Sequence, residues 1–349
     1  MNTEQTGILR ANAEKTELRD RLAPESIETL RRSGVFAWRT PAAFGGPWAS
    51  TTAVARSLAE FGRACPSAAW VAGTCATAKT LLARNFDDEE VLGEIFAEPD
   101  TLACGSGHPT AQGQRTAEGV RITGRWSALS GCEDSDWAAL ALTIDGSYSW
   151  AYVPTNRLVL DRTWQVPGMR GTGSHTLVAD DVLVPAQWVT AGSLPSPADR
   201  PFYAIAVLAP IVGAAYGALE VIDAMFASGR APSMSSYSSM AESAGARQWL
   251  AEATHLVDRA DRAMMTVAQA DERGDAPAEL DSARLSMMLA EAVSDCRSAI
   301  ERMLDLHGVS GFSTANPLQR YWRDIAVASR HPQFNGYLAV ERLGAVLAG

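Results

Sequence analysis

The strongest constraint on the fold is a change in hydrophobic periodicity near residue 101. Segments such as GVRITGRW, WAALALTI and HTLVADDVLV alternate apolar and polar residues, and turn residues separate them. Alternation with a period of two predicts β-strands that are buried on one face. The sequence before and after this region is instead rich in Ala, Leu, Arg and Glu at helical spacing. We therefore predict a small antiparallel β domain enclosed between two helical regions.

These regions define a mainly α protein with a central β domain. We place an N-terminal helical domain at 1–100, a β barrel or sandwich at 101–192 and a helical bundle at 193–349. The clearest helix covers 285–303, where the apolar residues fall on one stripe: Leu285, Met288, Leu289, Ala292, Cys296, Ala299, Ile300 and Met303. A stripe of this kind is typical of a bundle core.

The Ser-rich segment 230–245, RAPSMSSYSSMAESAG, interrupts the C-terminal helical region. Two interpretations stay open for it, a mobile loop over a pocket and a solvated connection.

The charge of the chain disfavours several kinds of partner. The formal net charge is −10 and the isoelectric point is about 5.1, and no basic patch is evident, so we expect no binding to nucleic acid or to an anionic membrane surface. The N-terminus is polar and acidic and lacks the pattern of a signal peptide. We also expect no uninterrupted apolar run as long as the roughly 18 residues of a membrane span. These features predict a cytoplasmic protein.

The five cysteines are odd in number, widely spaced and without a CxxC pair. This usage favours neither a disulfide framework nor a zinc site, and no HExxH or similar ligand spacing appears. We expect the cysteines to be small core residues and expect no metal.

The segment QRYWRDIAVASRHPQFN, 319–335, is predicted to be a helix with a defined start and end. Asn316 can cap its N-terminus, and Gln319 lies where a capping box places its second residue. Pro332 disfavours helical backbone at His331, so the helix should stop there. We expect the helix C-terminus to favour the imidazolium and raise the pKa of His331, which suits proton transfer. A structural cap is the alternative.

Two charged residues of this helix, Arg320 and Asp324, are four positions apart. This spacing allows an ion pair along the helix, and a solvated charged face is the alternative.

Two segments of the β region suit a flat heteroaromatic ligand. In RWSALSGCEDSDW, 125–137, Ser130 and Gly131 interrupt two apolar strands that each carry a tryptophan, so hydroxyl and backbone N–H groups can meet a ring that tryptophan covers. In GMRGTGSHTLVADDVLVP, 168–185, a Gly-rich turn leads into a strand. This turn is no phosphate loop, because it lacks the lysine of that motif and no helix follows.

Together these motifs resemble the acyl-CoA dehydrogenase superfamily, and more closely its flavin-dependent monooxygenase branch. That branch includes the oxygenase components of two-component systems such as 4-hydroxyphenylacetate hydroxylase, and dibenzothiophene monooxygenase. The matching stretches are GRWSALSGCEDSDW, VPGMRGTGSHTLVADDVLVP and LDLHGVSGFSTANPLQRYWRDIAVASRHPQFN. The resemblance covers nearly the whole chain. It implies an acyl-CoA dehydrogenase-like fold with a C-terminal four-helix bundle, a homotetramer, and a flavin between the β domain and the bundle.

The resemblance also implies roles for individual residues. Ser130 would approach the N5/C4a edge of the flavin, and His331 would be the active-site histidine. His108 in GSGHPT would be a second active-site imidazole, with a turn residue beside proline as the alternative. The implied cofactor-binding set is Trp126, Ser130, Gly131, Arg170, Ser174, Gly308, Gly311 and Arg320. The glycines 308 and 311 match positions that relatives present to the flavin of a neighbouring subunit.

The implied activity is that of a two-component monooxygenase. Reduced FMN or FAD from a separate reductase would react with O₂ to form a C4a-hydroperoxyflavin, which would hydroxylate an aromatic or otherwise electron-rich small molecule, as in secondary metabolism. An apolar, enclosed pocket would protect the hydroperoxyflavin from water. The chain is shorter than typical relatives, so the choice between FMN and FAD stays open.

One departure from the dehydrogenases favours oxygenation. In many of them the Arg-Asp pair, here Arg323-Asp324, is followed by a glutamate that removes a proton from the substrate; here HPQF follows. Two alternatives remain: an acyl-CoA dehydrogenase with Glu242 or Glu252 as its base, and a flavin-free, non-catalytic scaffold of the same fold.

Overall fold

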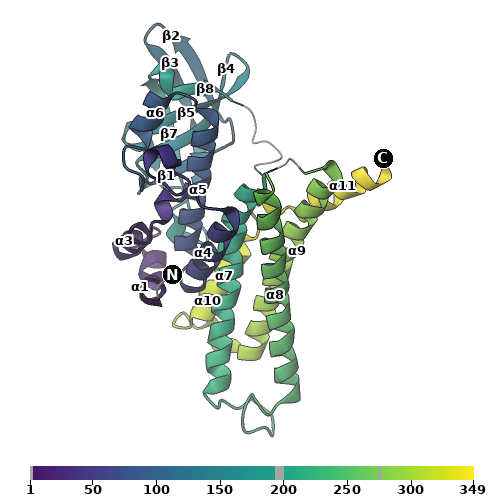
Figure 1. Cartoon of the computed structure of the whole chain (residues 1–349). Helices are drawn as coiled ribbons and strands as arrows, with labels where there is room; N and C mark the ends of the chain where they lie inside the picture. The colour runs from purple at the N-terminus through teal and green to yellow at the C-terminus, as the bar shows by residue number, and fades with distance from the viewer. Residues whose placement is uncertain (1–2, 193–199, 275–276) are drawn as a thin grey trace.

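The computed structural model describes residues 3–192, 200–274 and 277–349, and it gathers the strands at one end of the molecule, with the long C-terminal helices extending away from them (Figure 1). The helices before the sheet are α1 (Thr3–Ala11), α2 (Ala13–Leu18), α3 (Pro24–Arg32), α4 (Thr51–Ala64), α5 (Pro66–Asn85) and α6 (Glu89–Ile95). Those after it are α7 (Arg200–Ala227), α8 (Ala244–Glu272), α9 (Glu279–His307), α10 (Pro317–Ala328) and α11 (Gly336–Ala348). The predicted fold class, mainly α with a central sheet, is confirmed.

The strands are β1 (Ala103–Ser106), β2 (Ala111–Thr116), β3 (Gly119–Leu129), β4 (Trp137–Ile144), β5 (Ser147–Pro154), β6 (Val159–Asp161), β7 (His175–Val184) and β8 (Val189–Ala191). Their order in the sheet is β6-β7-β3-β2-β4-β5-β8, with β1 paired to β4. The prediction of an antiparallel domain is wrong in one part, because β1 and β2 both run parallel to β4. The Asp136 carboxylate accepts a hydrogen bond from Leu102 N, which holds the starts of β1 and β4 together.

A bulge between β3 and β7 positions the end of β3. The pairing register shifts between Trp126 and Leu129, and Ala128 within that interval has a φ of 60°. Bulges re-aim side chains and terminate pairing. Leu129 then pairs with His175, so Ser130 follows directly opposite the turn that precedes β7.

The long helices form the bundle in the way that the apolar stripe predicts. Six stripe residues are buried, namely Leu289, Ala292, Cys296, Ala299, Ile300 and Met303. Helix α7 packs closely on α4, because a Cβ at Gly213 would lie 2.1 Å from the carbonyl oxygen of Ala59. The five cysteines are all free and buried, as expected.

The expectation of no apolar run as long as a membrane span is wrong for α7. Within the described residues, α7 is the one helix long and apolar enough to span a membrane, with a mean hydropathy of 2.0 in its most apolar window. That window is 83% buried inside the protein, as in the core helix of a globular domain.

The turn before β7 is joined to helix α10 by close contacts. A Cβ at Gly168 would lie 2.1 Å from the carbonyl oxygen of Arg323, so only glycine allows this approach. The buried Asp324 carboxylate accepts a hydrogen bond from Met169 N, and Arg323 donates to the carbonyl of Pro167 and to Glu17. Two of the sequence motifs therefore form a single junction between the sheet region and the bundle.

This junction corrects two details of the predicted helix. Asn316 caps α10 through Leu318 N, as predicted, but the Gln319 side-chain oxygen accepts from Arg323 rather than completing a capping box. Asp324 is bonded across the junction and makes no recorded ion pair with Arg320 among the described residues. A helical spacing of four shows which side chains can meet along one helix, but a tertiary partner competes for them.

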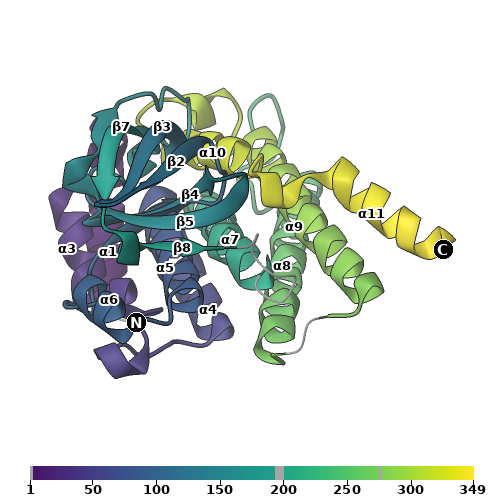
Figure 2. The ribbon, with the colours of Figure 1, turned by 90° about the horizontal axis from the view of Figure 1, so that it is seen from above.

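The two ends of the bundle differ in what surrounds them. The Ser-rich segment joins α7 to α8 at one end, where most of its residues are exposed, and α9 and α10 are joined near the same end (Figure 1). Helix α10 then returns to the opposite end, from which α11 projects away from the body of the molecule (Figures 1 and 2). The Ser-rich segment therefore lies far from His331 in this chain.

Candidate functional site

Ser130 lies in a buried cluster of hydroxyl groups between β3 and β7. Its Oγ is 2.8 Å from Ser174 Oγ, and Ser174 Oγ is 2.6 Å from Thr172 Oγ1, which donates to the carbonyl of Met169 at 2.8 Å. The indole N–H of Trp70 donates to Ser130 Oγ at 3.0 Å. We call Ser130, Ser174 and Thr172 the hydroxyl chain. All three residues are at least 92% buried, Ser130 being 8% exposed.

Backbone contacts hold the hydroxyl chain in place. Gly131 N donates to the carbonyl of Thr172 at 2.8 Å, so the two turns that carry Ser130 and Ser174 are bonded directly. Gly131 has a φ of 72°, which favours glycine, and a Cβ there would lie 2.8 Å from Val71. The serine is therefore presented by a short, well-supported turn.

His331 lies beside the same tryptophan. The rings of Trp70 and His331 meet edge to face with centroids 5.6 Å apart, and the ring of Phe334 lies 5.9 Å from that of His331. Trp70 therefore touches both residues that the resemblance marks as catalytic, Ser130 through its N–H and His331 through its ring. The structure brings these two residues to one place from motifs about 200 positions apart.

The expected rise in the pKa of His331 is wrong. Helix α10 ends at Ala328 with Ser329 as its C-cap, and His331 is instead the N-cap of the short 3₁₀ turn η7 (Pro332–Phe334). Its Nδ1 accepts from Gln333 N at 3.3 Å, so Nε2 carries the hydrogen. Burial against the neighbouring rings lowers the pKa of His331 to about 4. The imidazole is therefore neutral at physiological pH.

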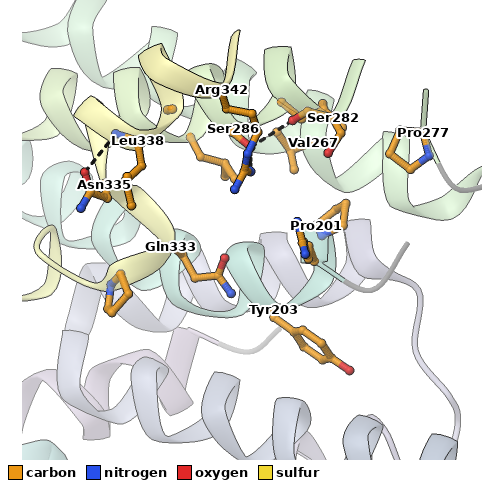
Figure 3. Close-up of a pocket in the computed structure, with 15 residues that line it drawn as sticks. Pro201, Tyr203, Val267, Pro277, Ser282, Ser286, Gln333, Asn335, Leu338 and Arg342 are labelled. Atoms are coloured by element: carbon orange, nitrogen blue, oxygen red, sulfur yellow. Dashed lines mark hydrogen bonds between the residues drawn. The ribbon is translucent and has the colours of Figure 1, made fainter. Parts of the chain in front are cut away.

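A cavity of about 340 Å³ opens beside this turn (Figure 3). Pro332 and Gln333 form one side of it, with the first turn of α7, the end of α8, the start of α9 and α11 around the rest. Its apolar lining is Pro201, Val267, Leu285, Leu289, Leu338 and Ala339. Arg342 donates to Ser286 Oγ at 3.1 Å across the cavity, as Figure 3 shows. Volume and lining suit a small organic molecule.

Arg170 and Arg320 meet at a separate narrow cleft. Arg170 pairs with Asp20 at 2.6 Å, and both arginines line the cleft together with Glu17 and Ser67. The Nε of Arg320 is buried and has no hydrogen-bond partner in the described chain. A buried donor without a partner is costly, and the cleft beside it, about 10 Å³, has room for about one water molecule.

Gly308 and Gly311 lie at the other end of α10, in and before the turn η6 (Val309–Phe312). The twelve residues of α10 place this turn roughly 18 Å along the helix from its other end, near His331. Gly308 is exposed with a φ of 71°, and a Cβ there would meet nothing within 4 Å. These glycines are not near Ser130 in the same chain.

Two predicted residues lie apart from the hydroxyl chain. Trp126 is completely buried, and its indole N–H donates to the carbonyl of Ala141 at 2.6 Å, so the ring belongs to the core of the sheet region. His108 is exposed on the loop between β1 and β2, beside Tyr148, whose hydroxyl donates to Gly107 O. No contact recorded in the described chain joins either residue to His331, and their roles stay predictions.

The two glutamates considered as dehydrogenase bases lie near the far end of the bundle. Glu252 pairs with Arg302 and accepts from Gln248, and it is about 15 residues, roughly 20 Å of helix, from Val267 in the cavity wall. Glu242 is exposed in the Ser-rich segment. Neither reaches His331 within this chain.

Thr172 is the site residue that the sequence did not reveal. Its place in the hydroxyl chain depends on the turn η4 (Arg170–Thr172), which begins after Met169 with a φ of 54° and ends at Gly173 with a φ of 50°. The Gly-rich pattern GMRGTGS indicated a turn, but not which hydroxyl would face Ser130.

Comparisons with known proteins agree with this architecture. The family model described as acyl-CoA dehydrogenase, C-terminal domain, matches residues 205–336. The oxygenase component of an FADH₂-dependent resorcinol hydroxylase from Rhizobium sp. is 31% identical over 362 residues, which covers 94% of this chain and 88% of that protein. The chain belongs to this family of flavin-dependent monooxygenase oxygenase components. It is therefore an oxidoreductase with an acyl-CoA dehydrogenase-like fold.

Two further relatives support the assignment. A pigment production hydroxylase from Rhodococcus sp. is 29% identical over 359 residues, covering 95% of this chain and 91% of the relative. The solved structure of XiaF from Streptomyces sp., in complex with FADH₂ and glycerol, matches with a TM-score of 0.91 at 26% identity and covers 99% of this chain and 93% of XiaF. The cofactor of this flavin-dependent family is a flavin.

Proposed function

We propose that this enzyme uses reduced FMN or FAD and O₂ to hydroxylate an aromatic or otherwise electron-rich small molecule, with the reduced flavin supplied by a separate reductase. The observation that carries the proposal is the neutral His331 imidazole, which lies across Trp70 from the Ser130 hydroxyl. Many acyl-CoA dehydrogenases have a carboxylate base at this place, where this chain has a histidine. Relatives are named as hydroxylases or monooxygenases of resorcinol and of indole-3-acetate, both aromatic molecules.

The residues present fit a flavin. The residue Ser130 is 8% exposed, and its Oγ has an acceptor position that neither Trp70 nor Ser174 occupies, which suits the N5 edge of the ring. When bound, the reduced flavin supplies the electrons that activate O₂.

His331 has the properties of a proton carrier toward the substrate. Its Nε2–H is free to donate, because only Nδ1 has a recorded partner among the described residues. Because Gln333 N donates to Nδ1, the ring hydrogen stays on Nε2, and a proton is exchanged with the substrate at that nitrogen. We propose that His331 hydrogen-bonds the substrate oxygen and moves a proton there.

We further propose that the substrate enters through the cavity of Figure 3. This cavity borders the η7 turn that holds His331, and its volume of about 340 Å³ fits a small aromatic molecule. Its aliphatic residues would contact the ring of the substrate, while Arg342, Ser286 and Gln333 would meet its polar groups.

The position of Gly308 and Gly311 supports the proposal of a homotetramer. Both lie too far from Ser130 in their own chain to touch the same flavin, so a role in cofactor binding requires another subunit. Large apolar side chains are exposed nearby and on α11, including Val309 at 90% and Tyr337 at 71% exposure. Light scattering of the purified enzyme would measure the assembly directly.

We also propose the division into domains at 1–100, 101–192 and 193–349 and a cytoplasmic location.

Stopped-flow absorbance tests the function. The apoprotein is mixed anaerobically with photoreduced FMN or FAD and then with oxygenated buffer. We expect a transient flavin absorbance that outlasts the reoxidation of free flavin. Immediate reoxidation without binding of reduced flavin would exclude the proposal, and bleaching of a bound oxidised flavin by acyl-CoA would instead show a dehydrogenase. Absence of any flavin affinity would indicate a non-catalytic scaffold.

A further inference from the structure

The hydroxyl chain has a direction that its end groups impose. The carbonyl of Met169 can only accept, and it lies 2.8 Å from Thr172 Oγ1, so the single hydroxyl hydrogen of Thr172 points to it. Ser174 Oγ is 2.6 Å from Thr172 Oγ1 and must therefore donate its own hydrogen to Thr172. The alternative would place two lone pairs against each other between Thr172 and the carbonyl.

The same reasoning determines whether the Ser130 hydroxyl donates or accepts. Because Ser174 donates to Thr172, it accepts from Ser130 across the 2.8 Å contact, and the hydroxyl hydrogen of Ser130 is committed to it. At the other end the Trp70 N–H, which can only donate, occupies one lone pair of Ser130. Ser130 keeps one free lone pair and no free hydrogen. Toward any ligand it is an acceptor only.

A flavin presents opposite chemistry at N5 in its two redox states. The reduced ring carries a hydrogen on N5 and donates, whereas N5 of the oxidised ring has a lone pair and accepts. We propose that the hydroxyl chain makes Ser130 a selective contact for reduced flavin, with Thr172 and Ser174 as the positioning residues that set this selectivity. The inference rests on the proposed function, in which Ser130 meets N5.

The selectivity has a use in a two-component enzyme. The oxygenase must take reduced flavin from solution and release oxidised flavin. Ser130 loses the N5 hydrogen as its partner when the flavin is oxidised, and this loss favours replacement of oxidised by reduced flavin. A buried polar contact without its partner costs about 1–3 kcal/mol. This corresponds to a difference in affinity of about fivefold to 150-fold, and a tenfold difference lies in the lower part of that range.

Anaerobic titrations of the apoprotein with reduced and oxidised FMN and FAD test the proposal through the ratio of the two dissociation constants. In Thr172→Val the chain loses its terminal acceptor, so Ser174 and Ser130 can reverse and donate to oxidised N5. We expect the preference for reduced flavin to fall about tenfold in this variant. Ser174→Ala frees the Ser130 hydrogen and should act in the same way, while Thr172→Ser retains the hydroxyl and should keep the wild-type ratio.

A second measurement needs no mutation. Oxidised 5-deaza-FMN has a C–H group in place of the N5 lone pair, so the wild-type enzyme should bind it more tightly than oxidised FMN. Equal binding of these two ligands, or an unchanged redox preference in folded Thr172→Val and Ser174→Ala, would overturn the inference. A wild-type protein that binds no flavin in either state would instead refute the proposed function.

Discussion

Ser130 and His331 touch the same tryptophan but lie in opposite kinds of environment. Every hydrogen bond of the Ser130 hydroxyl inside the protein is assigned, and backbone bonds hold its turn. His331 has one long hydrogen bond and is otherwise surrounded by aromatic rings. The first arrangement specifies a single orientation of a hydroxyl group, whereas the second leaves a ring nitrogen free to change partners.

This difference suggests that Ser130 recognises the cofactor and His331 transfers protons. A group that recognises a cofactor benefits from preorganisation, because a preset dipole needs no rearrangement when the ligand binds. A group that moves protons must gain and lose a hydrogen, so it is better left with few fixed partners. The two residues are held in register by the junction of Gly168 with Arg323 and Asp324, which joins the Ser174 turn to the helix leading to His331.

The largest effect should come from removing the imidazole. We expect His331→Ala to lower the rate of product formation by about 10² to 10⁴ while reduced flavin still binds, since general acid–base groups contribute about that factor. Product is measured by coupling to a reductase, and flavin binding by anaerobic titration. His331→Gln separates the roles, because glutamine can donate a hydrogen bond but cannot carry a proton. Wild-type turnover in His331→Ala would remove the histidine from the mechanism.

Breaking the junction should affect both regions together. In Gly168→Ala the new methyl group lies 2.1 Å from the Arg323 carbonyl oxygen, so backbone must move. We expect a loss of about 2–4 kcal/mol in the free energy of unfolding, together with weaker flavin binding. Gly7→Ala is the matched control, since a Cβ at Gly7 meets nothing within 4 Å. Unchanged denaturant midpoints for Gly168→Ala would contradict the role of the junction.

Filling the cavity should weaken substrate binding without changing the affinity for reduced flavin. Leu285→Trp adds an indole to the wall of the cavity, and we expect the KM for the aromatic substrate to rise about tenfold through lost pocket volume. The affinity for reduced flavin, measured in the same preparation, should stay at the wild-type value. A parallel loss of flavin affinity would place the cofactor, rather than the substrate, in this cavity.

The smallest effect concerns stability and pH. The folded pKa of His331 is about 4, below its unfolded value near 6.5, so its stabilising contribution is present above pH 6.5 and is lost as the pH falls through 4. Allowing for partial exposure, we expect the wild type to lose about 1–2 kcal/mol relative to His331→Gln over this interval. Asp324 titrates in both proteins and cancels. Parallel curves of unfolding free energy would show that burial does not depress this pKa.

Several features follow from local sequence rules. Alternating residues located the strands, the stripe of 285–303 located a core helix, and Asn316 caps α10 as predicted. The resemblance of the three motifs indicated the family and the flavin. The strands, the helix and the cap depend on the geometry of one element or one turn, which neighbouring residues largely determine.

Tertiary structure decided the features that depend on distant partners. The parallel pairing of β1 and β2 with β4 is invisible to alternation, which is the same for both strand directions. Burial beside the rings of Trp70 and Phe334 lowers the pKa of His331, although its sequence position suggested a charged helix end. The Asp324 carboxylate accepts a hydrogen bond from Met169 N instead of forming the predicted ion pair with Arg320.

The hydroxyl chain shows the distinction most clearly. The sequence contains Ser130, Thr172 and Ser174 and marks both of their turns, and from these alone each hydroxyl can donate or accept. Folding places a carbonyl at one end and an indole N–H at the other, and these two groups leave one direction for every hydrogen between them. The sequence therefore determined which residues carry the hydroxyl groups. The tertiary structure determined the direction in which each hydroxyl donates, because a hydroxyl can both donate and accept and its partners decide between the two.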